Sequence, residues 1–137
     1  MPADVLSITS FSELRREALE CERWNLLHPG EPARLPYVRQ LLQGREGPVV
    51  AATDYMRIVP DQIREWVDGR YLTLGTDGFG RSDSRAALRR FFEMDRAYIA
   101  VAALKALADD GRVDQATVVR AIKALGVDPD KPVPWKS

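Results

Sequence analysis

The chain has 137 residues, the size of a single domain, and its 20 basic and 20 acidic side chains cancel to no net charge. A chain without net charge has no overall positive field to attract nucleic acid or an anionic membrane, so neither is an expected partner. One cysteine, Cys21, excludes an internal disulfide, and together with one histidine, His28, it is too little for a structural zinc site.

The N-terminal part predicts a strand followed by an amphipathic helix. The aliphatic run Val5–Ile8 has strand character, and Ser10 with Glu13 fits a capping box at the start of a helix. Apolar residues three and four positions apart form one face of this helix: Phe11, Leu14, Ala18 and Cys21. We therefore expect Cys21 to be buried and not nucleophilic. No signal peptide precedes the strand, which indicates a cytoplasmic protein.

The middle of the chain predicts two short helices and two more strands. Pro36 opens a short helix, and the continuous run Val49–Thr53 predicts a central strand covered on both faces, as in parallel sheets. Pro60 opens the next helix, whose inward side chains are Ile63, Trp66 and Val67. The aromatic and β-branched run Tyr71–Leu74 then predicts a strand.

Three helices and a tail complete the prediction. The first carries Leu88, Phe91 and Phe92, and Asp95 caps the second, whose apolar run from Ala97 is far shorter than the ~20 residues that cross a bilayer. Asp114 caps the last helix, with these residues on one face: Val118, Val119, Ile122 and Leu125. We expect one domain over residues 1–128 and an irregular tail over residues 129–137.

This order predicts an α/β fold, a three-layer sandwich with a mostly parallel sheet and right-handed crossovers. Only three strands are visible, however, and the apolar strand Val5–Ile8 needs a neighbour to bury it. We therefore expect that a first strand and helix of the fold are missing ahead of this run.

A glycine-rich loop follows Tyr71–Leu74, at an edge where α/β proteins meet ligands and partners. Gly75, Gly78 and Gly80 do not match the spacing of a phosphate-binding loop, so we interpret them as turn glycines and expect positive φ at Gly78 and Gly80. Ser82, Asp83 or Ser84 is available to cap the helix that follows. The loop side chains with candidate contacts to a group outside the domain are Asp77, Phe79, Arg81, Ser82 and Asp83.

Two further candidates lie outside this loop. His28, in a loop after the first helix, is interpreted as a capping or interface residue. Asp54 follows the strand Val49–Thr53 at the carboxyl edge, where it either contacts a partner or caps the next turn. No triad, metal cluster or acid–base pair is visible, so no catalytic, cofactor-binding or metal-binding residue is predicted.

Several long stretches resemble one family in unbroken order: Val5–Leu14 (VLSITSFSEL), Cys21–Pro29 (CERWNLLHP), Ala52–Met56 (ATDYM), Leu74–Arg85 (LGTDGFGRSDSR) and Phe91–Asp95 (FFEMD). They are similar to the C-terminal region of the bacterial homodimeric pyruvate dehydrogenase, the decarboxylating component of the pyruvate dehydrogenase complex. The resemblance implies a transketolase-like C-terminal domain. It also implies that the complete enzyme uses thiamine diphosphate and magnesium to decarboxylate pyruvate and to acetylate the lipoyl group of dihydrolipoyl acetyltransferase.

The resemblance implies a supporting role for this chain. The family's cofactor-binding motif and active-site histidines belong to two other domains that have no counterpart here, so this chain alone is expected to bind no cofactor. Its expected partners are the catalytic domains of the same enzyme, the second subunit of the homodimer, and dihydrolipoyl acetyltransferase in the complex. The alternative is an independent α/β module that binds a protein or small ligand through the loop Asp77–Ser84.

Overall fold

The computed structural model of the chain describes residues 3–78 and 84–136. Their elements, in order, are α1 (Phe11–Leu27), α2 (Tyr37–Leu42), β1 (Val49–Ala52), α3 (Ile58–Asp61), the 3₁₀ helix η1 (Arg64–Trp66), β2 (Tyr71–Leu74), α4 (Arg85–Phe91), α5 (Arg96–Asp109), α6 (Gln115–Ala124) and the 3₁₀ helix η2 (Pro134–Lys136).

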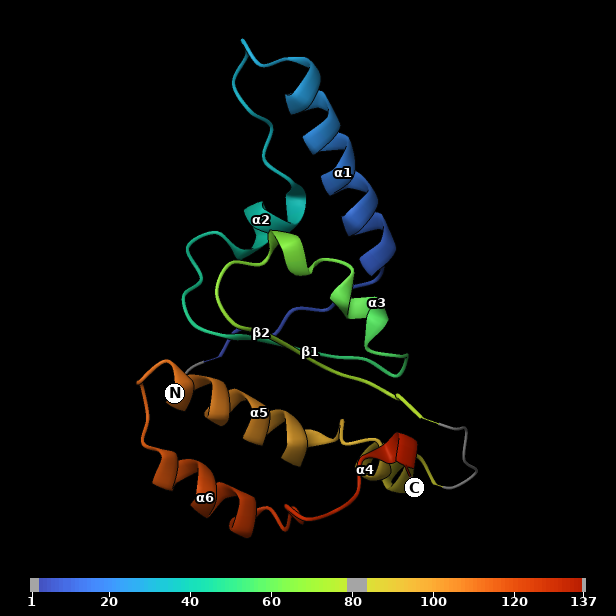
Figure 1. Ribbon diagram of the computed structural model, residues 1–137, viewed down its shortest axis with the longest axis vertical. Coiled ribbons are helices and arrows are strands. Elements are labelled where there is room, and N and C mark those ends of the chain that lie inside the picture. Colours follow the sequence, from blue (N-terminus) through green and yellow to red (C-terminus); the bar gives the residue numbers. More distant parts are fainter. Residues whose placement is uncertain (1–2, 79–83, 137) are drawn as a thin grey trace.

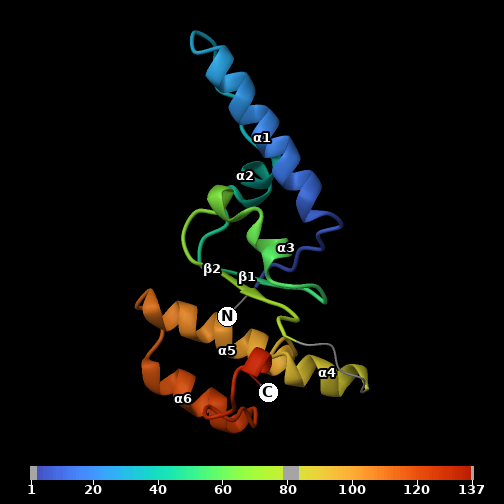
Figure 2. The same cartoon turned by 45° about the vertical axis from the view of Figure 1, so that its right-hand side comes forward.

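The two strands form a parallel pair at the centre of the molecule. Val49 lies opposite Tyr71 and Ala52 opposite Leu74, and the Thr53 amide extends the ladder by donating to the Leu74 carbonyl at 3.0 Å. Helices α1, α2 and α3 lie on one side of the pair, and α4, α5 and α6 lie on the other (Figure 1). The turned view keeps this separation (Figure 2). The predicted α/β class, the parallel pairing and the three layers are confirmed.

The predicted strand Val5–Ile8 is wrong for this structure. The run is not assigned to a strand, and Val5 is 93% exposed. The physical reason is that aliphatic character favours an extended backbone, whereas a strand also needs a neighbouring edge to pair with. Among the described residues β1 pairs with β2 alone, so its predicted central position is not found either.

Most helix starts follow the local sequence. The hydroxyls of Ser10 and Ser84 accept hydrogen bonds from the backbone three residues on, and the Asp95 carboxylate accepts from the Tyr98 amide. Two details differ from the prediction. Glu13 pairs with Arg16 at 2.6 Å instead of completing a capping box, and Asp114 precedes α6 without a capping hydrogen bond from its side chain.

Two other helix details also differ from the prediction. Helix α3 begins at Ile58, so Pro60 is its third residue and not its first. A proline is tolerated there because the first amides of a helix have no partner within it. On α6, Val118 is buried, but Val119 is 56% exposed and Leu125 is 40% exposed. The predicted apolar face of α6 is therefore only partly covered.

The hydrophobic core consists of two clusters, one on each side of the sheet. The larger cluster lies under α1 and contains Ala18, Val38, Ile63, Trp66, Val67 and Tyr71. The smaller one lies under α5 and contains Leu74, Phe92 and Met94. Alternate residues of β2 point to opposite faces, which is why this one strand contributes to both clusters.

Buried polar groups of the larger cluster have partners. The Trp66 indole donates to Glu22 at 2.9 Å, and the Tyr71 hydroxyl donates to the Pro60 carbonyl at 2.7 Å. Burial raises the pKa of Tyr71 above its usual value, and the nearby Asp61 carboxylate adds to that rise. The phenol therefore stays protonated and ties the start of β2 to α3.

The carboxyl edge of the sheet is set by a close backbone approach at Gly75. A Cβ atom on this residue would lie 2.5 Å from the Tyr55 carbonyl oxygen and 2.9 Å from the Arg57 amide nitrogen. Gly75 is thus required for close packing, a role that the interpretation as a turn glycine does not include. Gly78 does have the predicted positive φ, at 137°, and Gly80 lies outside the described residues.

Replacing Tyr71 by phenylalanine should lower the free energy of unfolding by about 1–3 kcal/mol, because the Pro60 carbonyl would lose its short hydrogen bond from the buried phenol and keep the longer one from the Ile63 amide, at 3.4 Å. Chemical unfolding followed by circular dichroism measures the change. Tyr37→Phe is the matched control: Tyr37 is 53% exposed, so its loss of a hydroxyl should stay within about 0.5 kcal/mol of the parent. Equal effects of the two variants would contradict the role given to this hydrogen bond.

Replacing Gly75 by alanine should destabilise the chain by about 1–3 kcal/mol, since the new methyl group overlaps backbone atoms that cannot rotate away. Thermal unfolding of Gly75→Ala beside Gly30→Ala tests this expectation. A Cβ on Gly30 meets nothing within 4 Å, so that control removes the same conformational freedom without a clash. A melting temperature of Gly75→Ala equal to that of the control would refute the close approach.

Candidate interface at the carboxyl edge of the sheet

The segments that follow β1 and β2 are joined by a small set of hydrogen bonds. The Thr76 amide donates to the Tyr55 carbonyl at 2.9 Å, and the Thr76 hydroxyl donates to the Asp54 carbonyl at 3.1 Å. The Arg57 amide donates to Asp77 Oδ1 at 2.9 Å. Parallel strands end at the same edge, so these bonds fix two loops side by side where α/β proteins bind partners.

Asp54 faces arginines of α4. Its carboxylate lies 3.8 Å from Arg85 Nη2 and 3.6 Å from Arg89 Nε. The alternative interpretation of Asp54 as a turn cap is not found, because the Thr53 hydroxyl accepts the hydrogen bond from the Tyr55 amide at 3.1 Å. Asp54 therefore links the loop after β1 to the helix that follows the glycine loop.

Asp77 has a structural role of its own. One carboxylate oxygen accepts from the Arg57 amide, and the other lies 3.9 Å from Arg57 Nε. Its side chain is 30% exposed, so the residue is partly accessible as well as bonded within the domain. Bonds between their two loops thus bring Asp54 and Asp77 to one edge, and their contacts with a partner stay a prediction.

The remaining loop candidates are Phe79, Arg81, Ser82 and Asp83, and all four lie outside the described residues. Their predicted contacts stay predictions. Sequence reasoning did not single out Arg57, Arg85 or Arg89 at this edge. The available signal was the spacing of Arg85 and Arg89, four residues apart on one face of a helix.

His28 is not part of this edge. It follows the end of α1 that points away from the strands in Figure 1, and its Nδ1 lies 2.8 Å from the Trp24 carbonyl oxygen. Its ring stacks on Trp24 with centroids 4.3 Å apart, and the Arg34 guanidinium lies 3.9 Å above the same indole. His28 therefore caps the C-terminal end of α1 in this structure, and its candidate interface contact stays a prediction.

Cys21 is buried on α1, as predicted, with 9% of its surface exposed. Its thiol donates to Glu17 at 3.0 Å. Burial, with a further contribution from the Glu17 carboxylate, raises the pKa of the Cys21 thiol to about 11. A thiol with this pKa is protonated near neutral pH, so Cys21 lacks the activation of a catalytic cysteine.

The C-terminal tail, residues 129–137 in the prediction, contacts the end of α4 and the loop after β2 through Lys131 and Pro134. The Lys131 ammonium donates to the Phe91 carbonyl at 3.0 Å and to Glu93 at 3.3 Å. Pro134 is buried, and its carbonyl carbon would lie 3.3 Å from a Cβ on Gly78. The segment after α6 is therefore packed against α4 and the loop that follows β2.

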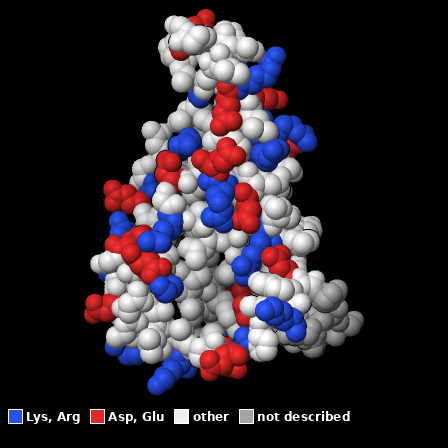
Figure 3. Space-filling view, viewed as in Figure 1, with Lys and Arg blue, Asp and Glu red and all other residues white. Residues whose placement is uncertain are grey.

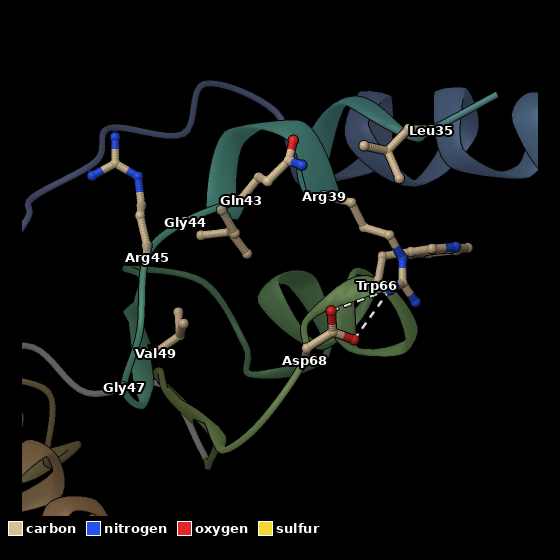
Figure 4. A pocket seen from close by; sticks show the side chains of 10 residues that line it. Leu35, Arg39, Gln43, Gly44, Arg45, Gly47, Val49, Trp66 and Asp68 are labelled. Atoms are coloured by element: carbon tan, nitrogen blue, oxygen red, sulfur yellow. Dashed lines mark hydrogen bonds and ion pairs between the residues drawn. The ribbon is translucent and has the colours of Figure 1, made fainter.

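A hollow of about 350 Å³ lies at the opposite edge, between α2, η1 and the start of β1 (Figure 4). Its walls include Leu35, Leu42, Val49 and Trp66. The charged groups at its rim are already paired, Arg39 with Asp68 at 3.1 Å and Arg45 with Asp4 at 2.5 Å.

Within the described ranges, residues 3–78 and 84–136, no three side chains of histidine, cysteine, aspartate or glutamate lie close enough together to hold a metal ion.

Comparison with known proteins agrees with this fold. The family described as the Transketolase-like TK C-terminal domain matches residues 1–95. The pyruvate dehydrogenase E1 component of Pseudomonas aeruginosa is 55% identical over 130 residues, which is 94% of this chain and 15% of the relative. The E1 components of Escherichia coli K12 and Mycobacterium tuberculosis are 50% and 51% identical over 94% and 92% of the chain.

The chain thus spans about one seventh of the length of these relatives, 14% to 15% of each. Its similarity to them extends through the carboxyl edge and the closing helices, since it covers more than nine tenths of the chain. The family match includes both strands and the loops that carry Asp54 and Asp77. The chain belongs to the transketolase-like C-terminal domain family and resembles the corresponding part of bacterial pyruvate dehydrogenase E1 components.

Proposed function

We propose that this chain is the C-terminal assembly domain of a pyruvate dehydrogenase that decarboxylates pyruvate and acetylates the lipoyl group of dihydrolipoyl acetyltransferase. The observation that carries the proposal is identity of 50% to 55% over 94% of the chain to enzymes of which it spans only 14% to 15%. Conservation on that scale favours the same place in the same kind of enzyme. The domain supports the subunit and supplies no catalytic group itself.

The chemistry of the described residues supports a domain that is catalytically inactive by itself. Each charged side chain that lines the hollow beside β1 lies in an ion pair, Arg39 with Asp68 and Arg45 with Asp4, and those of the carboxyl edge lie in longer ion pairs. The one histidine caps α1, and the one cysteine is buried with a raised pKa. General acid–base or nucleophilic catalysis requires a titratable group near its working pKa in a site that a substrate reaches.

Thiamine diphosphate and magnesium belong to the complete enzyme in this proposal. The described part of the chain does not fit them, because it brings together no set of carboxylates for the metal and Asp68, at the hollow, already pairs with Arg39. The cofactor's chemistry is therefore assigned to the other domains of the enzyme. This chain contributes by holding its neighbours in place.

The surface of the domain supports contact with those neighbours. Helices cover both faces of the two described strands, but the outer edge of each strand has no strand partner among the described residues. Val5 is 93% exposed, and Leu26 and Leu27, at the outer end of α1, are 76% and 55% exposed. The expected partners are the catalytic domains of the same enzyme and the second subunit of its homodimer, which would bury these side chains.

The charge distribution fits a protein partner better than a polyanion. Acidic and basic side chains alternate over the face in Figure 3 without a large area of one sign. Within the described residues, no helix is long and apolar enough to cross a membrane. The proposal places the protein in the cytoplasm, in keeping with its single cysteine.

A complementation assay tests the assembly role. The E1 component of Pseudomonas aeruginosa, truncated to remove the segment that matches this chain, is mixed with the 137-residue chain, thiamine diphosphate and magnesium. We expect pyruvate decarboxylation to be low in the truncated enzyme, to recover with the chain, and to be absent from the chain alone. Turnover by the chain alone, or a mixture no more active than the truncated enzyme, would contradict the proposal.

A pair of variants locates the contact. Val5→Lys should leave the melting temperature of the isolated chain unchanged, because Val5 is already exposed there. It should weaken complementation by about tenfold or more, the loss expected when ~1.4 kcal/mol of buried apolar contact is removed. Val119→Lys, at an exposed position of α6, is the matched control.

A further inference from the structure

Three arginines gather around two aspartates at the carboxyl edge of the sheet, and their guanidinium groups donate no hydrogen bond to another described residue. Arg85 and Arg89 flank Asp54 at 3.8 and 3.6 Å, and Arg57 lies 3.9 Å from Asp77. These separations exceed the ~3.2 Å reach of a hydrogen bond to a carboxylate. The aspartates therefore attract the arginines without satisfying their N–H groups.

Ion pairs elsewhere in the domain have a different geometry. Arg64 donates to Asp61 at 2.7 Å, and Arg90 donates to Asp95 at 3.1 Å. At the carboxyl edge, by contrast, the Nε atoms of Arg57 and Arg89 are buried and have no hydrogen-bond partner among the described residues. Buried N–H donors in proteins usually have an acceptor, so an acceptor is missing at these two atoms.

Asp54 and Asp77 do not supply the missing acceptors, because their carboxylates already face other donors. One oxygen of Asp77 accepts the Arg57 amide, and the carboxylate of Asp54 lies between two arginines. Three positive and two negative side chains leave one surplus positive charge at the edge. An added group must bring negative charge and several acceptor atoms.

The guanidinium group of arginine is well suited to bind a negatively charged group with several oxygen atoms. A guanidinium presents five N–H donors in a plane and binds phosphate and carboxylate oxygens in pairs. Arg85 and Arg89 lie four residues apart on α4 and so reach out from one face of the helix. Arg57 lies three residues after Asp54 in the loop after β1, so an oxyanion would be held from two elements, this loop and α4.

We propose that the carboxyl edge of the sheet is a binding site for an oxyanion, a phosphate or carboxylate group, which accepts hydrogen bonds from Arg57, Arg85 and Arg89. Asp54 and Asp77 hold the three side chains in place and limit the net charge, so that binding is specific to a group with several oxygens. The site belongs to this domain alone. It is independent of the assembly role, and its test needs no other part of an enzyme.

The test is a titration of the 137-residue chain with inorganic phosphate and, in a second arm, with acetate. Chloride keeps the ionic strength constant, and the arginine Nε–H resonances are followed by nuclear magnetic resonance. We expect the Arg57 and Arg89 signals to shift saturably, with a Kd near ~1 mM for the preferred anion. Saturation by phosphate alone identifies a phosphate site, and saturation by both anions identifies a site that also takes carboxylates.

Variants separate this site from general attraction of anions. Arg89→Gln should weaken binding about tenfold or more, and Arg15→Gln, the same charge change on an exposed part of α1, should not weaken it. Arg85→Gln provides a second variant at a side chain that is 78% exposed, where loss of folding is not expected. No saturable shift with either anion, or equal weakening by Arg15→Gln, would overturn the proposal.

Discussion

The close approach of two backbone segments at Gly75 is the constraint on which the carboxyl edge depends. It lets the Thr76 amide reach the Tyr55 carbonyl and the Arg57 amide reach Asp77. These bonds hold the loop after β1 against the loop after β2, and in that position Asp54 faces the arginines of α4. Because Gly75 has no side chain, the two loops can pack closely, and this packing places Asp54 beside helix α4.

The sheet around this approach is small for the number of helices it organises. Two parallel strands separate a layer with α1, α2 and α3 from a layer with α4, α5 and α6, and β2 contributes to the core on both sides. Parallel sheets are stable when both faces are covered and their edges are paired or protected. The exposed aliphatic side chain of Val5 supports the proposal that neighbouring domains contact this chain.

Local features of the fold were predictable from the sequence, because they depend on neighbouring residues. The caps at Ser10 and Asp95, the buried stripe of α1 and the strand at Tyr71 follow from hydrogen bonding and periodicity within a few positions. Features that depend on distant residues were not predictable. Val5–Ile8 has strand character without a partner edge, and Gly75 looks like a turn glycine until the loop after β1 packs against it.

The candidate site shows the same division. The position of Asp54 and Asp77 at one edge follows from parallel topology, whereas the approach of Arg85 and Arg89 to Asp54 depends on how α4 packs. A loop and a helix that are separated by a whole strand in the chain give no local signal of such a contact. The family resemblance indicated the context of the domain, but not these charged neighbours.

Amide hydrogen exchange at the sheet tests most directly the claim that another polypeptide covers it. The exchange rates of the Val49 and Thr53 amides, which donate to the carbonyls of Arg70 and Leu74, are measured in the chain alone and in its mixture with the truncated Pseudomonas aeruginosa E1 component. The account predicts exchange at least about tenfold slower in the mixture, an increase of ~1.4 kcal/mol in local stability. Equal protection of these two amides in the chain alone and in the mixture would contradict it.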